Sequence, residues 1–514
     1  MAKKLSFTNA VAVGLGNIIG AGIFVMAGSA IGAAGPAALL AFVITAVLAI
    51  TVGLNTAELS SRFPELEGGV YSFARATMGD TIGFLVGWFR LVAYAISGAA
   101  VALGFSSYLI SVGLPGWVYF PAAVALIAVL TLIEAGGIKL ASQMEVGLVA
   151  VKIVGLAVFL VVVFALARFS ASNFTPLFPT GAMGVLVAAN IAFFAYSGFN
   201  TIATLTPDVE DGGKTVPRAI IASIGISTAL YVLVVFALLL ALNWAAYGTA
   251  SNPLSLALGS VGAPSAVSYA VDAAALAATL AVTLSMIIAG SRTMKQMGED
   301  DLLPYRLGVG SKTPAFVVAI VMIASLGLGN VESIALVANF GVVFSYMLTG
   351  VQVAIARRKH TSTSFSSPGY PSVQAFSVVL SAAMLLGLGT QSLLVGVVTL
   401  MAGLVVHSVW THLRANHDHQ RDSVITRGLG GPNGDLLRPS YDVVVIGSGA
   451  SGLTAALSAA SKGAGVVVLE RGRKFGGSSA LSGGQLWVPN NRCRLWHDTW
   501  AVHHLRISGG HRLC

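Results

Sequence analysis

Cysteine and histidine are almost absent from this chain of 514 residues. It has 2 cysteines and 9 histidines, and none of them precedes His360. A disulfide framework and a Cys/His metal site are therefore excluded from everything before that residue, and so is a proton relay built on histidine. Any chemistry in that long stretch has to use other groups.

Charged residues are also scarce. They make up 10% of the chain, against 56% hydrophobic residues and a mean hydropathy of +0.84, whereas soluble domains carry about 25% charged residues. Apolar runs recur at the length of about 20 residues that a bilayer span needs. The sequence predicts an all-α polytopic membrane protein with twelve transmembrane helices, near residues 8–31, 37–57, 81–111, 118–134, 143–166, 183–206, 219–242, 265–290, 314–329, 333–356, 373–390 and 392–411.

The net charge of +9 is placed unevenly along the chain. Up to residue 360, one set of alternate loops holds fourteen Lys or Arg residues, and the opposite set holds only Arg168. This is the positive-inside bias. It predicts a multi-pass protein of the cytoplasmic membrane with both termini in the cytoplasm and the lipid bilayer as its surroundings, and it argues against nucleic acid as a partner.

Glycine breaks the first predicted span. Four glycines fall within nine residues of the stretch 14–22, and each costs a helix about 1 kcal/mol relative to alanine. A break at membrane depth is tolerated where the backbone lines a polar cavity or is buried in protein, and free N–H groups there suit a carboxylate. Close helix packing through Gly16 and Gly20 is the other explanation.

Two basic residues lie inside predicted spans. Arg90 shares a helix face with Tyr94, and the pattern fits a structural ion pair, a snorkelling side chain or a functional group equally well. Lys152 lies about 13 Å from the cytoplasmic end of its helix, close to the bilayer centre. Since ionisable groups at that depth mark ion pathways, we expect Lys152 to exchange a proton, with a fixed structural charge as the alternative.

The sixth predicted span has a second weak point at Ser197-Gly198, flanked by aromatic residues. The first and sixth spans each open a set of five. Interrupted segments at corresponding positions of two halves point to the substrate site of an inverted-repeat transporter. The pairing of the two weak points favours binding over packing.

These motifs resemble the amino acid–polyamine–organocation superfamily over residues 1–411. The resemblance rests on 16–24 in the first span, 57–64 and 68–71 after the second, 194–199 in the sixth, and the loop segments 215–220, 291–292 and 302–304. It implies a 5+5 inverted repeat of the leucine-transporter type. It also implies a secondary active transporter that moves amino acids by alternating access.

The resemblance also implies site residues. In the family, the first break binds the substrate carboxylate through backbone N–H groups, and the carbonyl groups of the sixth span receive the amino group. A lysine of the fifth span, near hydroxyls of the eighth, implies coupling to protons. Carried over to this sequence, the substrate-binding residues are Ile19, Gly20, Ala21, Gly22, Phe194, Ala195, Tyr196, Ser197 and Gly198, and the coupling residues are Lys152 and Ser285.

Several alternatives stay open at this point. An amino acid–amine exchanger without proton coupling would use Lys152 as a fixed charge. The absence of acidic residues from the first, third and sixth spans favours neutral substrates. The sequence names neither the amino acid nor the oligomeric state. Transport would need no cofactor.

The composition changes after the twelfth span. Residues 412–440 predict a cytoplasmic linker, and 441–446 predict a buried strand. Gly447, Gly449 and Gly452 then form a dinucleotide fingerprint, with Glu470 placed for a ribose hydroxyl. This segment resembles the N-terminal FAD-binding part of a flavoprotein of the fumarate reductase and ketosteroid dehydrogenase kind.

A complete nucleotide domain needs more strands than the remaining chain supplies. We therefore expect 441–490 to be a truncated FAD-binding-like fragment with a Rossmann-like βαβ start, followed by an irregular tail at 491–514. FAD could bind there without enzymatic activity, and the chain as a whole is not expected to be an enzyme. A membrane-anchored flavin-dependent oxidoreductase is the remote alternative.

Overall fold

The computed structural model describes residues 4–429 and 441–469, except for short segments at 64–65, 67–68, 137, 201, 203–208, 249, 251, 305–306, 308–311 and 360–362. The chain divides into two compact units, Met1–Leu413 and Arg414–Cys514. The first unit is helical throughout its described part. The second contains a small parallel sheet with one helix after its first strand.

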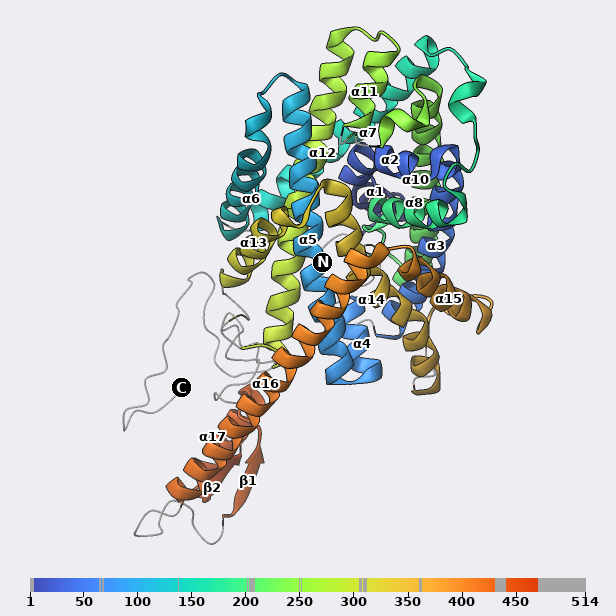
Figure 1. Cartoon of the computed structure of the whole chain (residues 1–514). Coiled ribbons are helices and arrows are strands. Elements are labelled where there is room, and N and C mark those ends of the chain that lie inside the picture. The colour runs from blue at the N-terminus through green and yellow to red at the C-terminus, as the bar shows by residue number, and fades with distance from the viewer. Residues whose placement is uncertain are drawn as a thin grey trace, which may run out of the picture. The chain divides into compact units, whose positions relative to one another are not determined.

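Unit 1 is built from helices joined by short turns (Figure 1). The α-helices are α1 (Phe7–Ile18), α2 (Ala21–Ala34), α3 (Ala38–Arg62), α4 (Val70–Met78), α5 (Asp80–Ser111), α6 (Tyr119–Gly136), α7 (Ile138–Leu166), α8 (Gly181–Tyr196), α10 (Gly212–Ala241), α11 (Pro253–Ser260), α12 (Ser265–Glu299), α13 (Thr313–Ser325), α14 (Val331–Lys359), α15 (Ser372–Leu386) and α16 (Gly389–Leu429). Short 3-10 turns flank several of them, among them η5 (Trp244–Tyr247) and η7 (Leu326–Leu328).

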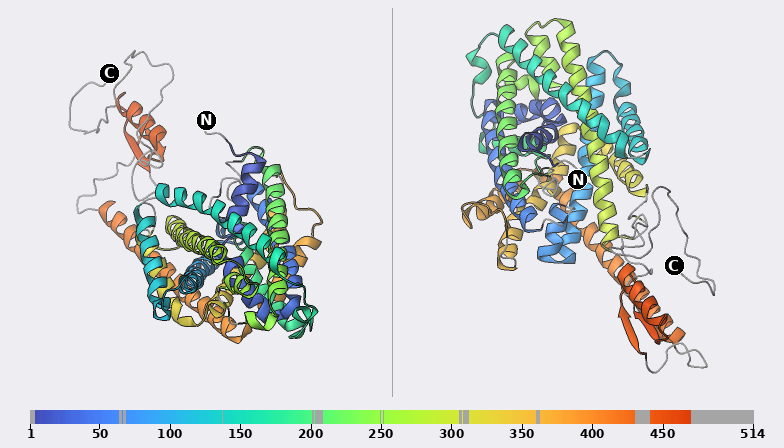
Figure 2. Two further views of the ribbon diagram at one scale, coloured as in Figure 1. Left: turned by 90° about the horizontal axis from the view of Figure 1, so that it is seen from above. Right: turned by 180° about the vertical axis from the view of Figure 1, so that it is seen from behind.

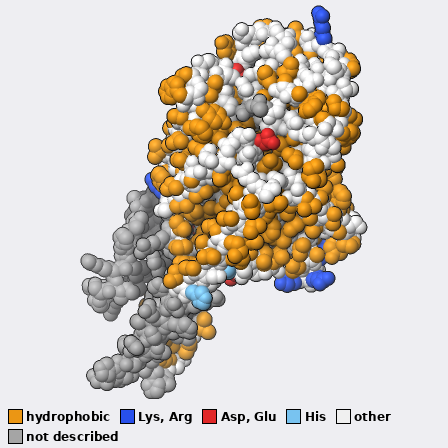
Figure 3. Space-filling view, in the orientation of Figure 1, with side chains coloured by type: hydrophobic (Ala, Val, Ile, Leu, Met, Phe, Trp, Pro, Cys, Tyr) orange, Lys and Arg blue, Asp and Glu red, His pale blue; other side chains and the backbone are white. Residues whose placement is uncertain are grey.

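Seven helical segments among the described residues are long and apolar enough to cross a membrane. Shorter apolar helices occupy the predicted first, fifth, sixth, ninth and eleventh spans. The space-filling view shows apolar side chains over most of the visible face, with Lys and Arg at its margins (Figure 3). The prediction of a helical polytopic membrane protein is therefore confirmed, whereas the number of twelve spans and the inverted repeat stay predictions.

Helices α5 and α12 form the centre of unit 1. They pack along each other, α14 packs on α5, α2 on α8, and α10 on α3. A view along α5 and α12 shows the two helices nearly end-on and side by side (Figure 2). Buried hydroxyl groups donate to carbonyl oxygens one turn back, as Thr45 does to Ala41 (2.9 Å) and Thr283 to Thr279 (2.8 Å), which satisfies polar atoms without water.

The ion pairs of the described residues gather at one end of the helices. Glu58 at the end of α3 pairs with Arg62 and with Arg357 near the end of α14. Arg75 of α4 pairs with Asp80 at the start of α5 and with Asp300 just after α12. All of these positions lie in or beside loops that the sequence predicts to be cytoplasmic.

The described residues of unit 2 comprise the last part of α16, two strands and the helix between them. Strand β1 (Val443–Ile446) pairs in parallel with β2 (Val466–Leu469), and α17 (Ala450–Ala460) connects them. The predicted strand, turn and helix are therefore present. The structure differs from the predicted linker at 412–440, since α16 continues as helix to Leu429. Residues 412–427 lack both glycine and proline, so no local residue ends the helix there.

Candidate functional site

The first predicted break is present in the structure. Helix α1 ends at Ile18, Ile19 leaves helical geometry with φ −72° and ψ 84°, and Gly20 is extended with φ −120° and ψ −161°. Helix α2 then starts at Ala21 without a side-chain cap. The first N–H groups of a helix have no partner inside it, so the start of α2 offers donors at a buried position.

The second break follows α8. This helix ends at Tyr196, and Ser197 and Phe199 form tight turns whose N–H groups donate to Phe194 (3.4 Å) and Tyr196 (3.2 Å). Residues 201 and 203–208 lie outside the described part of the chain. The helix therefore stops at the position that the sequence marks as weak, and the carbonyl groups of Phe194 and Tyr196 accept hydrogen bonds from these tight turns.

The two breaks touch each other through their backbones. A Cβ atom on Gly22 would overlap Ala195, and one on Gly198 would overlap the carbonyl oxygen of Asn17. Both neighbours are backbone atoms and cannot turn aside as a flexible side chain would. Glycine is required at both positions, because the backbones of the two breaks pack directly against each other.

Tyr231 of α10 links the two breaks. Its hydroxyl group lies 2.7 Å from the carbonyl oxygen of Ile18 and 3.1 Å from that of Ala195, and its side chain is fully buried. A hydroxyl carries one proton, so it can donate to only one of these oxygens at a time. No motif points to this residue, which is a lone tyrosine in an apolar run.

Tyr196 points away from the first break. Its hydroxyl lies 3.1 Å from Oγ1 of Thr228 and 3.4 Å from the carbonyl oxygen of Phe42. Its ring meets that of Tyr231 edge to face, with 5.2 Å between the centroids. In this arrangement Tyr196 contributes its backbone and a supporting ring to the site, and its hydroxyl belongs to the packing of α8 against α3 and α10.

Lys152 of α7 reaches the first broken helix. Its Nζ donates to the carbonyl oxygen of Gly16 (3.0 Å), and only 2% of the residue is exposed. Gly16 lies in the last turn of α1, where that carbonyl has lost its helical donor because the chain unwinds at Gly20. Ser285 of α12 donates to Ala281 of its own helix (3.0 Å).

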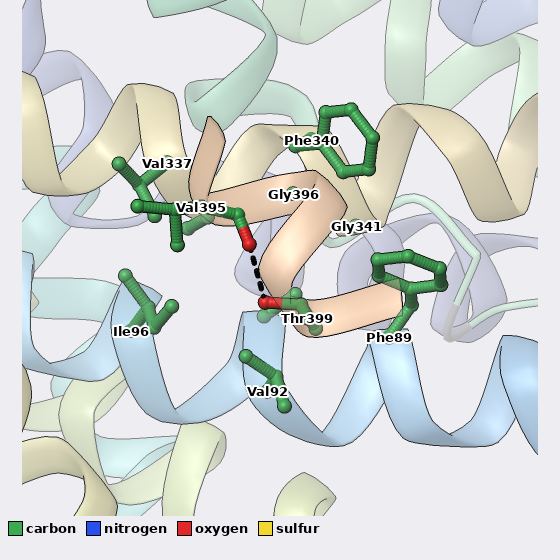
Figure 4. A pocket seen from close by; sticks show the side chains of 11 residues that line it. Phe89, Val92, Ile96, Val337, Phe340, Gly341, Val395, Gly396 and Thr399 are labelled. Atoms are coloured by element: carbon green, nitrogen blue, oxygen red, sulfur yellow. Dashed lines mark hydrogen bonds between the residues drawn. The ribbon is translucent and has the colours of Figure 1, made fainter. Parts of the chain in front are cut away.

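Two cavities elsewhere in unit 1 do not suit an amino acid. One lies between α5, α14 and α16 and holds about 10 Å³, room for about one water. Phe89, Phe340 and aliphatic residues line it, and its Thr399 hydroxyl donates to Val395 (2.8 Å) (Figure 4). The other is a groove between α7 and α12 lined only by alanine, valine and glycine. Neither offers charged groups.

The described part of unit 2 contains the glycine turn of the predicted fingerprint. Gly447 has φ 95°, Gly449 caps α17, and a Cβ atom on Gly452 would overlap the carbonyl oxygen of Gly447. This is the tight strand-to-helix turn that places a diphosphate at a helix N-terminus. Glu470 lies outside the described residues.

Comparison with known proteins decides the family. The sequence profile described as amino acid permease matches residues 5–413. The chain belongs to the amino acid permease family. A second profile, described as FAD binding domain, matches residues 442–509. The two predicted resemblances, to a permease of the amino acid–polyamine–organocation superfamily and to an FAD-binding segment, are therefore confirmed.

The relatives of this permease carry different substrates. It is 29% identical over 437 residues to the branched-chain amino acid permease BcaP of Bacillus subtilis, a match that covers 80% of this chain and 93% of the relative. It is also 29% identical over 438 residues to the methylthioribose transporter of the same organism, with 80% and 94% covered. A cationic amino acid transporter of Arabidopsis thaliana is 29% identical over 59% of the chain and 53% of the relative.

These findings show a multi-pass membrane transporter whose family requires no cofactor. One of the relatives carries a sugar rather than an amino acid. Membership of the family alone therefore does not identify the substrate.

Proposed function

We propose that this permease is a secondary active transporter that moves neutral amino acids across the cytoplasmic membrane by alternating access, coupled to protons. One observation carries the proposal. The two broken helices meet backbone to backbone at Gly22 and Gly198, and Lys152 holds a carbonyl group of the first break.

The substrate would lie across the two breaks. The N–H groups at the start of α2, from Gly20 to Gly22, suit its carboxylate, because a helix N-terminus favours negative charge. The carbonyl oxygens of Ile18 and Ala195 suit its ammonium group, which brings three donors where the hydroxyl of Tyr231 brings one. Phe194 and the backbone of Tyr196, Ser197 and Gly198 would border the bound molecule.

Lys152 would couple the proton. A protonated amine donates a charge-assisted hydrogen bond to Gly16, which is stronger than the bond from a neutral amine. Loss of the proton would therefore loosen the end of α1 and bias the first break toward another arrangement. Ser285 is the proposed neighbour on α12.

The proposal also gives an orientation. The end of the helices that holds Glu58, Arg357 and Arg75 would face the cytoplasm, together with both termini, because the loops there carry most of the basic residues. Twelve spans in a 5+5 inverted repeat would then place the breaks of the first and sixth spans at one depth.

Uptake into proteoliposomes tests the proposal. A panel of labelled amino acids, with methylthioribose included, is measured with and without an inward proton gradient for the purified full chain and for Lys152→Ala. We expect gradient-stimulated uptake of at least one neutral amino acid, lost in the variant. Lys214→Ala is the matched control, because that lysine is exposed and should leave uptake unchanged.

Two results would overturn parts of the proposal. Uptake that ignores the gradient and requires internal amino acid would make the protein an exchanger and Lys152 a fixed charge. Uptake of methylthioribose alone would assign a sugar to the site and remove the amino acid.

A further inference from the structure

Asp272 of α12 is a buried acid without a basic partner among the described residues. It is 3% exposed, and none of the ion pairs between described residues includes it. Glu58, by contrast, is fully buried and pairs with two arginines. An ionised carboxylate that is taken out of water without a cation destabilises the fold. The groups around Asp272 therefore indicate whether it carries a charge or a proton.

Two hydroxyl groups from other helices contact Asp272. Ser255 of α11 donates to its Oδ1, and Ser111, the last residue of α5, forms a hydrogen bond with the same carboxyl group. Ser111 also donates to the carbonyl oxygen of Tyr108 (2.8 Å). A hydroxyl carries one proton, so while Ser111 donates to Tyr108 it can only accept from Asp272. This chain of hydrogen bonds is complete when Asp272 is a protonated, neutral acid.

The titratable groups on the neighbouring helices form no ion pair with Asp272 among the described residues. Tyr108 of α5 interacts electrostatically with it, and Tyr269, three residues earlier on α12, is 58% exposed. Helix α11 contains no charged residue. The basic residues of α5 and of 150–166 in α7 are Arg90 and Lys152, which contact two tyrosines and the first break. A proton is therefore the remaining means of neutralising this carboxylate.

Asp272 lies toward the end of unit 1 that is opposite to the ion pairs. It is about 40 Å along α12 from Asp300, and α11 and α4 lie at opposite ends of the helices (Figure 1). The hydroxyl of Tyr108 donates to the carbonyl oxygen of Phe24 in the first turn of α2, just after the first break. A Cβ atom on Gly28 of α2 would overlap the first residue of α11. The groups around Asp272 therefore connect α11 to the helix that begins at the proposed substrate site.

We propose that Asp272 is a second proton-binding residue of this permease, and that its protonation holds α11 against α5 and α12. As a neutral acid, Asp272 accepts from Ser255 and donates to Ser111, which joins the three helices without a buried charge. Water stabilises the ionised form, so loss of the proton favours an arrangement in which α11 moves away and water reaches the carboxylate. A proton taken up from outside would then close α11 over a bound substrate, a use that rests on the proposed function.

Cysteine labelling of the purified full chain tests the closure of α11 without transport. Ala257 is fully buried on α11, and Ser260 at the end of the same helix is exposed. Each is replaced by cysteine in a chain whose own two cysteines are removed by Cys493→Ser and Cys514→Ser. The rate of reaction with a maleimide is then measured over a series of pH values, with and without Asp272→Asn. Because the same thiol is compared in both chains at each pH, the ionisation of the thiol itself does not affect the comparison.

At alkaline pH, Ala257→Cys should react about ten-fold more slowly when Asp272→Asn is also present, because the neutral amide keeps α11 closed and the ionised acid does not. The two rates should become equal at acidic pH. Asp272→Glu should keep a pH-dependent rate, and Glu332→Gln, the same change of charge at the start of α14, should behave as the wild type. The exposed thiol of Ser260→Cys should react equally in both chains. Equal rates for Ala257→Cys at every pH would overturn the proposal, and so would a difference that does not change with pH.

Uptake into proteoliposomes connects the closure to transport. In the wild type, the apparent KM for a transported amino acid should rise as the external pH rises, because the ionised acid no longer favours closure over the bound substrate. Asp272→Asn should flatten this rise, and Asp272→Glu should restore it. A KM that depends on pH equally in the wild type and in Asp272→Asn would remove Asp272 from the transport cycle. Proteoliposomes without any uptake would refute the proposed transport function, while the labelling result would still stand.

Discussion

Buried charges are paired differently in two regions of unit 1, the end where the ion pairs gather and the middle near the two helix breaks. Glu58 is fully buried and accepts from Arg62, Arg357 and the backbone N–H of Ser367 at 2.8–2.9 Å. Arg357 also donates to the carbonyl of Ser367 (2.9 Å). In the middle, Arg90 contacts the rings and hydroxyl groups of Tyr94 and Tyr346, and no carboxylate pairs with it among the described residues.

The difference between Glu58 and Arg90 indicates which buried charge stabilises the fold. A carboxylate with three partners fixes the ends of α3 and α14, and both of its oxygens already accept hydrogen bonds from the protein. A cation held by neutral groups adds little stability. The end of the bundle that holds Glu58 therefore acts as a fixed frame, and Arg90 is not part of it.

Removal of the Glu58 carboxylate should have the largest effect on the free energy of unfolding. Glu58→Gln leaves Arg62 and Arg357 without their anion, and breaking a buried ion pair costs about 3–5 kcal/mol. Titration with a denaturing detergent should show a loss of that size in the free energy of unfolding. Glu299→Gln, at an exposed position, is the control, and equal losses in both variants would remove the contrast.

Added volume between the breaks should have the next largest effect. Gly198→Ala forces a methyl group against the carbonyl of Asn17, and overpacking costs about 1–3 kcal/mol. We expect that loss in the same titration, together with loss of uptake. Gly225→Ala on α10 is the matched control, since its Cβ would meet no atom within 4 Å. A variant that keeps full stability and uptake would refute the close contact.

The hydroxyl that links the breaks should have a smaller effect. Tyr231→Phe removes one hydrogen bond and keeps the ring, so the expected loss of stability is about 1 kcal/mol. Because the carbonyls of Ile18 and Ala195 then have no competing donor, we expect the apparent KM of a transported amino acid to fall while the maximal rate changes less. A raised KM would mean that Tyr231 positions these carbonyls for the substrate.

Removal of the lone cation should have the smallest effect on stability. Arg90→Met deletes a charge that has no carboxylate partner among the described residues, and a well-packed apolar replacement is neutral or stabilising in such cases. We expect the free energy of unfolding to stay within about 1 kcal/mol of the wild type or to increase. A loss as large as that of Glu58→Gln would make Arg90 part of the frame.

Local signals predicted much of this arrangement. Glycine content located the break at Ile19-Gly20, and the four-residue spacing predicted that Arg90 and Tyr94 share a face. Contacts between distant segments left no such signal. Tyr231 reaches the breaks from α10 and Tyr346 reaches Arg90 from α14, and only the packing of the helices determines which tyrosine of an apolar run points inward.

Strand β1 has a practical consequence for anyone who handles this protein. Val444 is 55% exposed and Ile446 is 86% exposed, on a sheet with only one other strand among the described residues. Two strands alone are marginally stable, and an apolar edge is a template for self-association. Yield, shelf life and resistance to proteases should therefore depend on this small sheet, although the permease profile matches residues 5–413.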